Sequence, residues 1–136
     1  MARLIESSLW VDFTRRRTPP ELKARIHPWI LDPLAVVCEP VMFEVLWHAT
    51  PDERPKILAQ FATMPVLPPP PRFWGVATHL GQTCRDNGLT PGSMDLLIAT
   101  IAIQHDAELV TFDTDFAHIA KVTPLKVRLL HRAVEG

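Results

Sequence analysis

Short runs of apolar residues recur along the chain, and longer segments with apolar residues at helical spacing separate them. The runs share a strand-like length and lie at residues 3–5, 34–38, 65–67, 108–112 and 125–130. An unbroken apolar run such as Leu34 to Cys38 is typical of a strand buried on both faces, as in a parallel sheet. The run at 65–67 is framed by prolines, which remove ladder donors, so it is predicted to be a short edge strand. We therefore expect a sheet of about five strands.

Helices are predicted between these strands. They begin after a helix-capping or proline residue and cover the segment after Ser7 and Ser8, residues 21–31, 41–49, 51–64, 73–87 and 94–105, and a short stretch ending at Ile119. Ser7 or Ser8 and Ser93 are predicted as N-caps, because a serine oxygen can accept a bond from a free amide in the first turn. Strands that alternate with helices favour right-handed crossovers. The pattern predicts a three-layer α/β/α fold, with a mostly parallel central sheet and helices on both faces.

Length and composition indicate one domain over residues 1–136. Apolar residues make up 47% of the chain and charged residues 21%, which is ordinary for a globular protein. No apolar stretch approaches the length needed to span a bilayer, and the N-terminal apolar run is too short for a signal peptide. We expect no membrane association and a cytoplasmic location. Cys38 and Cys84 have no zinc-ligand spacing and are expected to be buried apolar residues.

The formal net charge of −1 gives no global electrostatic case for nucleic-acid binding. Any RNA-binding surface must therefore be local. The candidates are the run Arg15, Arg16 and Arg17, together with Arg72 and Arg85, although each taken alone is commonly a solvated surface charge. The six histidines show no zinc-binding spacing, and no glycine-rich phosphate loop is present.

Acidic residues stand at the ends of the predicted strands or near the starts of the helices that follow them. Glu6 follows the first strand, Asp113 and Asp115 follow the fourth, Glu44 lies one turn into the helix after the second, and Asp95 begins a helix. In an open α/β sheet, ligands bind beyond the carboxyl ends of the strands. If the first and fourth strands are neighbours, these side chains converge on one crevice.

Several crowded carboxylates repel one another, and a hard divalent cation relieves that repulsion. Such a cation polarises a phosphoryl oxygen and activates water, so the pattern favours metal-assisted phosphodiester hydrolysis. Each residue also has a purely structural interpretation. Asp95 could complement a helix dipole, and Asp113 or Asp115 could cap the next helix. Glu44 is harder to explain structurally, because burying a carboxylate on an apolar helix without a partner is costly.

Four segments of the chain resemble the successive motifs of PIN-domain toxins of the VapC type. The segments are Leu4–Phe13 (LIESSLWVDF), Phe43–Leu46 (FEVL), Ser93–Ala99 (SMDLLIA) and Val110–Phe116 (VTFDTDF). They occur in the order of the family and span nearly the whole chain. Each motif alone is weak, whereas four in order with matching strand and helix context are specific.

The resemblance implies a ribonuclease toxin of a type II toxin-antitoxin system. It assigns Glu6, Glu44, Asp95 and Asp113 to catalysis and metal binding, with Asp115 as a supporting carboxylate. It places Ser7 or Ser8 and Ser93 near the metal, as hydroxyl groups around the ligands. It also implies Mg²⁺ or Mn²⁺ as cofactor, an RNA substrate, a homodimer, and a VapB-type antitoxin whose C-terminal tail enters the active-site groove.

Glu6 departs from the family pattern, which has aspartate at this position. The additional methylene moves the carboxylate outward in a site where Mg²⁺ needs near-octahedral geometry. From the sequence we expect Glu6→Asp to tighten Mn²⁺ binding and raise activity, unless Glu6 already ligates with its longer side chain. The departure leaves open a catalytically weakened PIN domain that acts as an RNA- or antitoxin-binding module.

A receiver-like signalling domain is a further alternative, because it also gathers acids at the strand ends of a parallel sheet. That class needs paired acids after the first strand and a lysine after the last. Here Glu6 stands alone, and no lysine occupies the corresponding place.

Overall fold

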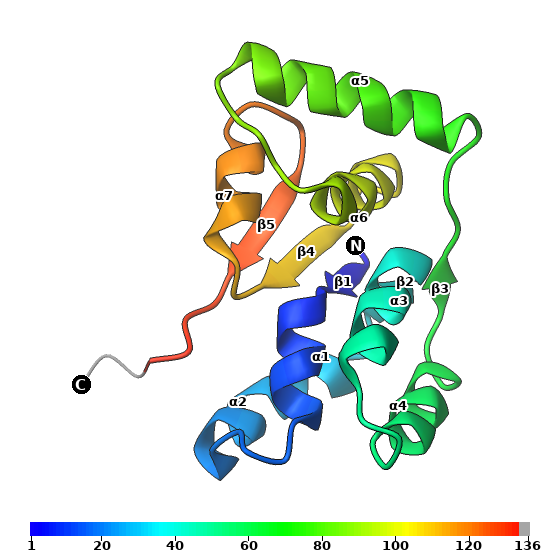
Figure 1. Ribbon diagram of the computed structural model, residues 1–136, viewed down its shortest axis with the longest axis vertical. Coiled ribbons are helices and arrows are strands. Elements are labelled where there is room, and N and C mark those ends of the chain that lie inside the picture. The colour runs from blue at the N-terminus through cyan, green and yellow to red at the C-terminus, as the bar shows by residue number, and fades with distance from the viewer. Residues whose placement is uncertain (134–136) are drawn as a thin grey trace.

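The centre of the protein is a five-stranded sheet in which every neighbouring pair of strands is parallel (Figure 1). This computed structural model describes residues 1–133, so the last three residues of the predicted domain lie outside the described part. The strand order is β3-β2-β1-β4-β5. The strands are β1 Arg3–Ile5, β2 Ala35–Cys38, β3 Val66–Leu67, β4 Glu108–Thr111 and β5 Lys126–Leu129. The first and fourth strands are neighbours, which is the condition under which the acidic residues converge, and the predicted edge position of β3 is confirmed.

Seven helices connect and flank these strands in the described part of the chain. They are α1 Ser7–Thr14, α2 Pro20–Leu31, α3 Glu39–His48, α4 Arg54–Phe61, α5 Phe73–Asp86, α6 Ser93–Gln104 and α7 Thr114–Ala120. All four residues of β2 are buried, and so are three successive residues of β4. Successive strand residues point to opposite faces, so both faces of the sheet are covered and the α/β class is confirmed. None of these helices is both long and apolar enough to cross a membrane.

The predicted serine caps are wrong. The N-cap of α1 is Glu6 and that of α6 is Gly92, neither with a side-chain capping bond. Ser7 and Ser8 lie inside the first turn of α1. The Ser7 hydroxyl donates to Glu44 of α3, and the Ser8 hydroxyl donates back to Glu6, the N-cap residue. These bonds to carboxylates outweigh the preference of serine for the N-cap.

Two helices differ most from the bounds that the sequence pattern predicts. Helix α4 is shorter than the predicted 51–64, because turns occupy both of its ends. Helix α3 begins at Glu39 rather than at Val41, so that Pro40 lies in its first turn. Proline is tolerated there because the amide it lacks has no partner within the helix.

The core joins β1, α1 and α4 around Trp10, which is fully buried. The Trp10 indole N–H donates to the Ile5 carbonyl oxygen at 3.1 Å. Its ring meets that of Phe61 edge-on, with ring centroids 4.9 Å apart. Cys38 and Cys84 are free and buried, as expected. This packing fixes the start of α1 against the end of β1, where the acidic residues lie.

Candidate active site

The site lies beyond the carboxyl ends of β1 and β4, which are central neighbours in the sheet (Figure 1). The register pairs Ile5 with Val110, so β4 ends only one residue beyond the end of β1. The Glu6 N–H then donates to the Val110 carbonyl oxygen at 3.0 Å. Because α1 starts directly after Glu6, its first residues lie beside the loop that follows β4. The topology thus brings residues that are far apart in sequence to one edge.

Three aspartates gather at this edge. Asp95, Asp113 and Asp115 each contribute a carboxylate oxygen, and these oxygens all lie within 4.8 Å of one another. Asp95 belongs to the first turn of α6, and Asp113 is the N-cap of α7, where its Oδ1 accepts the Asp115 N–H at 2.9 Å. Carboxylate oxygens gathered in this way could hold one metal ion.

The electrostatics of Asp95 reflect this crowding. Burial raises its pKa to about 7, with further contributions from the negative charges of Asp113, Glu6, Glu44 and Asp115. All five carboxylates singled out in the sequence thus lie in one electrostatic neighbourhood. Holding them ionised together is unfavourable without a compensating cation.

Glu6 and Glu44 are held by hydroxyl groups and are not members of the 4.8 Å group. Ser7 Oγ donates to Glu44 Oε1 at 2.7 Å. Glu6 is only 5% exposed, and its Oε1 accepts from Ser8 Oγ at 2.6 Å and from Thr111 Oγ1 at 2.5 Å. Burial raises the pKa of Glu6, while these two hydrogen bonds act in the opposite direction. Both serines at the start of α1 thus contact acidic residues of the site.

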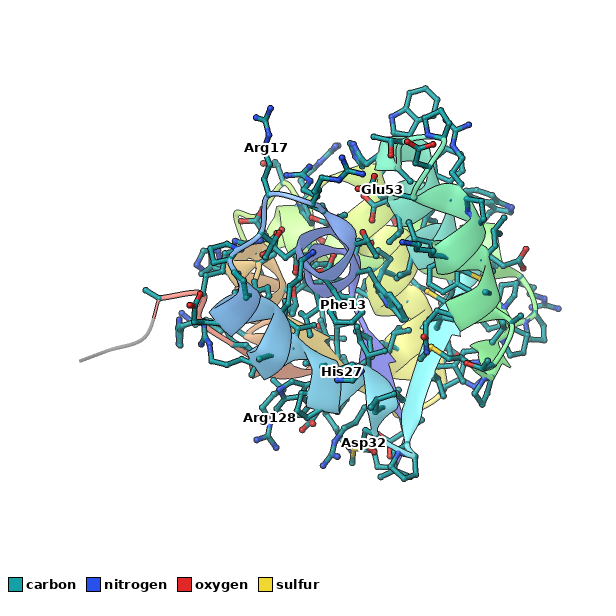
Figure 2. All side chains as sticks on the ribbon, turned by 90° about the horizontal axis from the view of Figure 1, so that it is seen from below. Phe13, Arg17, His27, Asp32, Glu53 and Arg128 are labelled. Carbon is teal, nitrogen blue, oxygen red and sulfur yellow. The ribbon has the colours of Figure 1, made fainter. Side chains whose placement is uncertain are left out.

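Ser93 and the arginine run lie apart from these contacts. Ser93 is an exposed residue at the start of α6, and its hydroxyl takes part in none of the side-chain hydrogen bonds found within residues 1–133. Arg15, Arg16 and Arg17 are exposed in the turn after α1, and Figure 2 shows Arg17 projecting away from the body of the protein.

A cavity of about 620 Å³ lies between α1 and α4. Its lining includes Phe13 and Arg16 from the α1 side and Lys56 and Ile57 from α4. Phe13 stacks on His27 of α2, with ring centroids 5.6 Å apart (Figure 2). The aspartates of the 4.8 Å group do not line this cavity, so it is separate from the acidic edge.

Sequence reasoning missed Thr111, the last residue of β4. It is fully buried, donates to Glu6 Oε1, and accepts the Asp113 N–H at 2.9 Å. A signal was present, because a hydroxyl residue at the end of a buried strand, two positions before an acid, is suited to hold the loop that follows.

Comparisons with known proteins identify the family of the chain. The profile of the PIN domain family matches residues 3–122. The chain is 32% identical to "Ribonuclease VapC11" of Mycobacterium tuberculosis and to "VapC ribonuclease Mb1587" of Mycobacterium bovis, over 90% of this chain and 95% of each relative.

Solved structures show the same fold. The chain superposes with a TM-score of 0.76 on a chain of VapBC2 from Rickettsia felis bound to a DNA fragment, at 16% identity, covering 96% of this chain and 99% of that one. The TM-score is 0.71 for VapBC-1 from nontypeable Haemophilus influenzae, at 19% identity, covering 95% and 98%. With the family profile and the relatives above, these likenesses show that the chain belongs to the PIN domain family and, within it, to the VapC group.

Proposed function

We propose that the protein is a metal-dependent endoribonuclease, the toxin of a VapBC-type pair, that hydrolyses RNA phosphodiester bonds. The observation that carries the proposal is the group of Asp95, Asp113 and Asp115 oxygens within 4.8 Å, beside two further carboxylates. The relatives that are 32% identical are named as ribonucleases, which supports the same reaction.

The donor set fits Mg²⁺ or Mn²⁺. The three members of the group are all carboxylates, which are the ligands that hard cations prefer, and none is a histidine or cysteine. Burial, together with the neighbouring negative charges, raises the pKa of Asp95 to about 7, and a bound cation would act in the opposite direction. When bound, a divalent metal polarises a phosphoryl oxygen and activates water for attack.

The protein's own side chains would hold this centre and leave it open to substrate. Asp113 is half-buried and Asp115 is exposed, so an RNA phosphate can approach from solvent. Glu44 adds a carboxylate fixed by Ser7, while Glu6 anchors the base of the site. An acidic edge alone repels RNA, so we propose that Arg15, Arg16 and Arg17 provide the attraction for its backbone.

The partners we propose are an antitoxin of the VapB type and a second copy of this chain. The solved structures named above are VapBC assemblies, which supports the antitoxin. Large exposed aromatic side chains on α3 and α5 support a homodimer, because they leave apolar surface uncovered.

The first prediction is that RNA cleavage requires Mg²⁺ or Mn²⁺ and stops in EDTA. We call Asp95, Asp113 and Asp115 the metal group, because they are the side chains proposed to hold the cation. Asp113→Asn should lower the rate by about tenfold to a hundredfold, because it removes one carboxylate from the metal group. Asp86→Asn, which changes an exposed carboxylate on α5, is the matched control and should cleave like the wild type. Gel-resolved cleavage of a defined RNA measures the rate of the wild type with and without EDTA, and the rates of the two variants. Undiminished cleavage in EDTA would contradict the metal mechanism.

Metal titration, combined with the cleavage assay, distinguishes an active enzyme from the catalytically weakened PIN domain that the sequence leaves open. Calorimetric titration with Mn²⁺ should show binding that Glu44→Gln weakens. Metal binding without any RNA cleavage would favour the binding module instead.

A further inference from the structure

One oxygen of Glu6 organises the backbone on which the metal group is built. Ser8 Oγ and Thr111 Oγ1 lie 3.4 Å apart, and both donate to Glu6 Oε1, at 2.6 and 2.5 Å. A hydroxyl has a single proton, so each is left with only its lone pairs for any further bond. Glu6 thereby fixes both hydroxyls as acceptors toward the rest of the site.

Two consecutive backbone amides after β4 use these acceptors. The Phe112 N–H donates to Ser8 Oγ at 3.0 Å, and the Asp113 N–H donates to Thr111 Oγ1 at 2.9 Å. Asp113 in turn accepts the Asp115 N–H and so starts α7. A continuous series of hydrogen bonds therefore runs from Glu6 through Thr111 to the two aspartates of the metal group that follow β4.

The length of the Glu6 side chain matters to this series. An aspartate would withdraw the carboxylate by about 1.5 Å, the length of one carbon–carbon bond. The distances from the Ser8 and Thr111 hydroxyl oxygens to the carboxylate would then exceed the normal hydrogen-bond range. Ser8 and Thr111 would be free to turn their protons elsewhere, and the Phe112 and Asp113 amides would lose fixed acceptors.

We propose that Glu6 is a positioning residue, which acts on the metal group through Thr111 and Asp113 and needs the length of glutamate to do so. This reverses the outcome of Glu6→Asp that the sequence alone favours. The inference rests on the proposed function for its metal and activity readouts, but its backbone readout stands independently.

Glu6→Gln and Glu6→Asp distinguish a positioning residue from a metal ligand. The two roles predict opposite answers to which of these variants loses more Mn²⁺ affinity. Glutamine keeps the length and an acceptor oxygen without the charge, whereas aspartate keeps the charge without the length. For a positioning residue, Glu6→Asp should weaken Mn²⁺ binding by about tenfold to a hundredfold, and Glu6→Gln should weaken it less. For a metal ligand, glutamine should be the more damaging change. Calorimetric affinity and the cleavage rate measure the order.

Thr111 supplies the matched pair of variants. Thr111→Ser keeps the hydroxyl and should retain Mn²⁺ affinity, whereas Thr111→Val removes it at nearly constant volume and should behave like Glu6→Asp. Circular dichroism establishes that each variant is folded. If Thr111→Val does not fold, the order of the two Glu6 variants decides the question.

Amide hydrogen exchange in the metal-free protein tests the backbone step directly. In Glu6→Asp, the Phe112 and Asp113 amides should exchange about two- to tenfold faster, the effect of losing one hydrogen bond, while Glu6→Gln should leave them protected. Unchanged exchange in Glu6→Asp overturns the inference, and so does a Glu6→Asp protein that binds Mn²⁺ as tightly as the wild type. If the wild type neither binds Mn²⁺ nor cleaves RNA, the proposed function fails, and the exchange rates still decide the role of Glu6.

Discussion

At the residue scale, Asp95 carries the clearest mark of the site's crowding. Its pKa rises to about 7 because the group is partly buried and four other carboxylates surround it. Without a bound cation, the Asp95 carboxyl binds a proton at mildly acidic pH. The same proton competes with any metal, so Mn²⁺ affinity should fall as the pH drops below 7.

The second prediction concerns the stability of the metal-free protein as a function of pH. The pKa of Asp95 is about 7 in the folded protein against an ordinary value of 3.8, so the folded state binds more protons between these values. Stability contributed by protonated Asp95 is therefore complete at low pH and is lost as the pH rises toward 7. The melting temperature in EDTA should fall by a few degrees between about pH 5 and about pH 8.

Asp95→Asn should flatten that dependence, because it removes the titrating group. Some slope should remain, since burial also raises the pKa of Glu6. Asp86→Asn serves as the control and should keep the slope of the wild type. Equal slopes in the wild type and Asp95→Asn, measured by scanning calorimetry, would contradict the assignment.

Much of the site could be predicted because acids after parallel strands must meet at one edge. Asp113 and Asp115 follow that rule, whereas Asp95 starts a helix that comes after another helix, and the structure brings all three together. The local sequence around Thr111 indicates its bond to the following loop, but not its bond to Glu6, because Glu6 lies 105 positions away in the sequence. The proposed ligand roles of Glu6 and Glu44 stay predictions, since hydroxyl groups hold one oxygen of each.

At the element scale, α1 is the element on which the site depends most. It is short, has no capping side chain, and carries Ser7 and Ser8 in its first turn. Packing of Trp10 against β1 and α4 therefore has to hold it, because short helices are marginal without tertiary contacts.

The third prediction is that Trp10→Phe lowers the free energy of unfolding by about 2–4 kcal/mol, since it leaves a gap and deprives the Ile5 carbonyl of its donor. Urea denaturation measures this loss, and the slope of the free energy of unfolding against urea concentration should be unchanged. Trp74→Phe, at a side chain that is 70% exposed, should stay within about 0.5 kcal/mol of the wild type. Equal losses in the two variants would show that Trp10 does not anchor α1.

The positions of helices and strands were predictable where the apolar pattern was strong, as in β2 and α5. The residues at which they begin and end were less predictable. Ser7 and Ser8 have the residue type of N-caps, but Glu44 and Glu6 compete for their hydroxyls. A single sequence gives local preference and no measure of that competition.

At the scale of the whole molecule, large aromatic side chains remain on the surface of two helices. Phe43 and Trp47 stack on α3 with ring centroids 6.4 Å apart, and Trp47 is 74% exposed. Trp74 of α5 is similarly exposed. Side chains of this kind dominate interfaces when they are covered, which supports the proposed homodimer.

The fourth prediction is that the wild type sediments as a dimer and that Trp47→Ser combined with Trp74→Ser shifts it toward monomer. The double variant removes apolar surface that an interface would bury, while leaving the core intact. Leu31→Ser, at an exposed apolar residue of α2, is the control and should leave the dimer unchanged. A wild type that is monomeric from micromolar to millimolar concentration would exclude this interface.

The central place of β1 in the sheet has a consequence for biosynthesis. Of the five strands of the sheet it leaves the ribosome first, yet its partner β4 pairs Glu108 with Arg3, so about a hundred residues must follow before that edge is covered. At typical elongation rates this takes about 5–20 s, during which the first strand has only β2 beside it. Glu6 can meet Thr111 only after residue 111 has been made, and Asp113 and Asp115 follow it. A nascent chain that ends before β4 therefore lacks the assembled acidic edge, and an RNA-cleaving activity built on it would begin only after translation has passed the loop that follows β4.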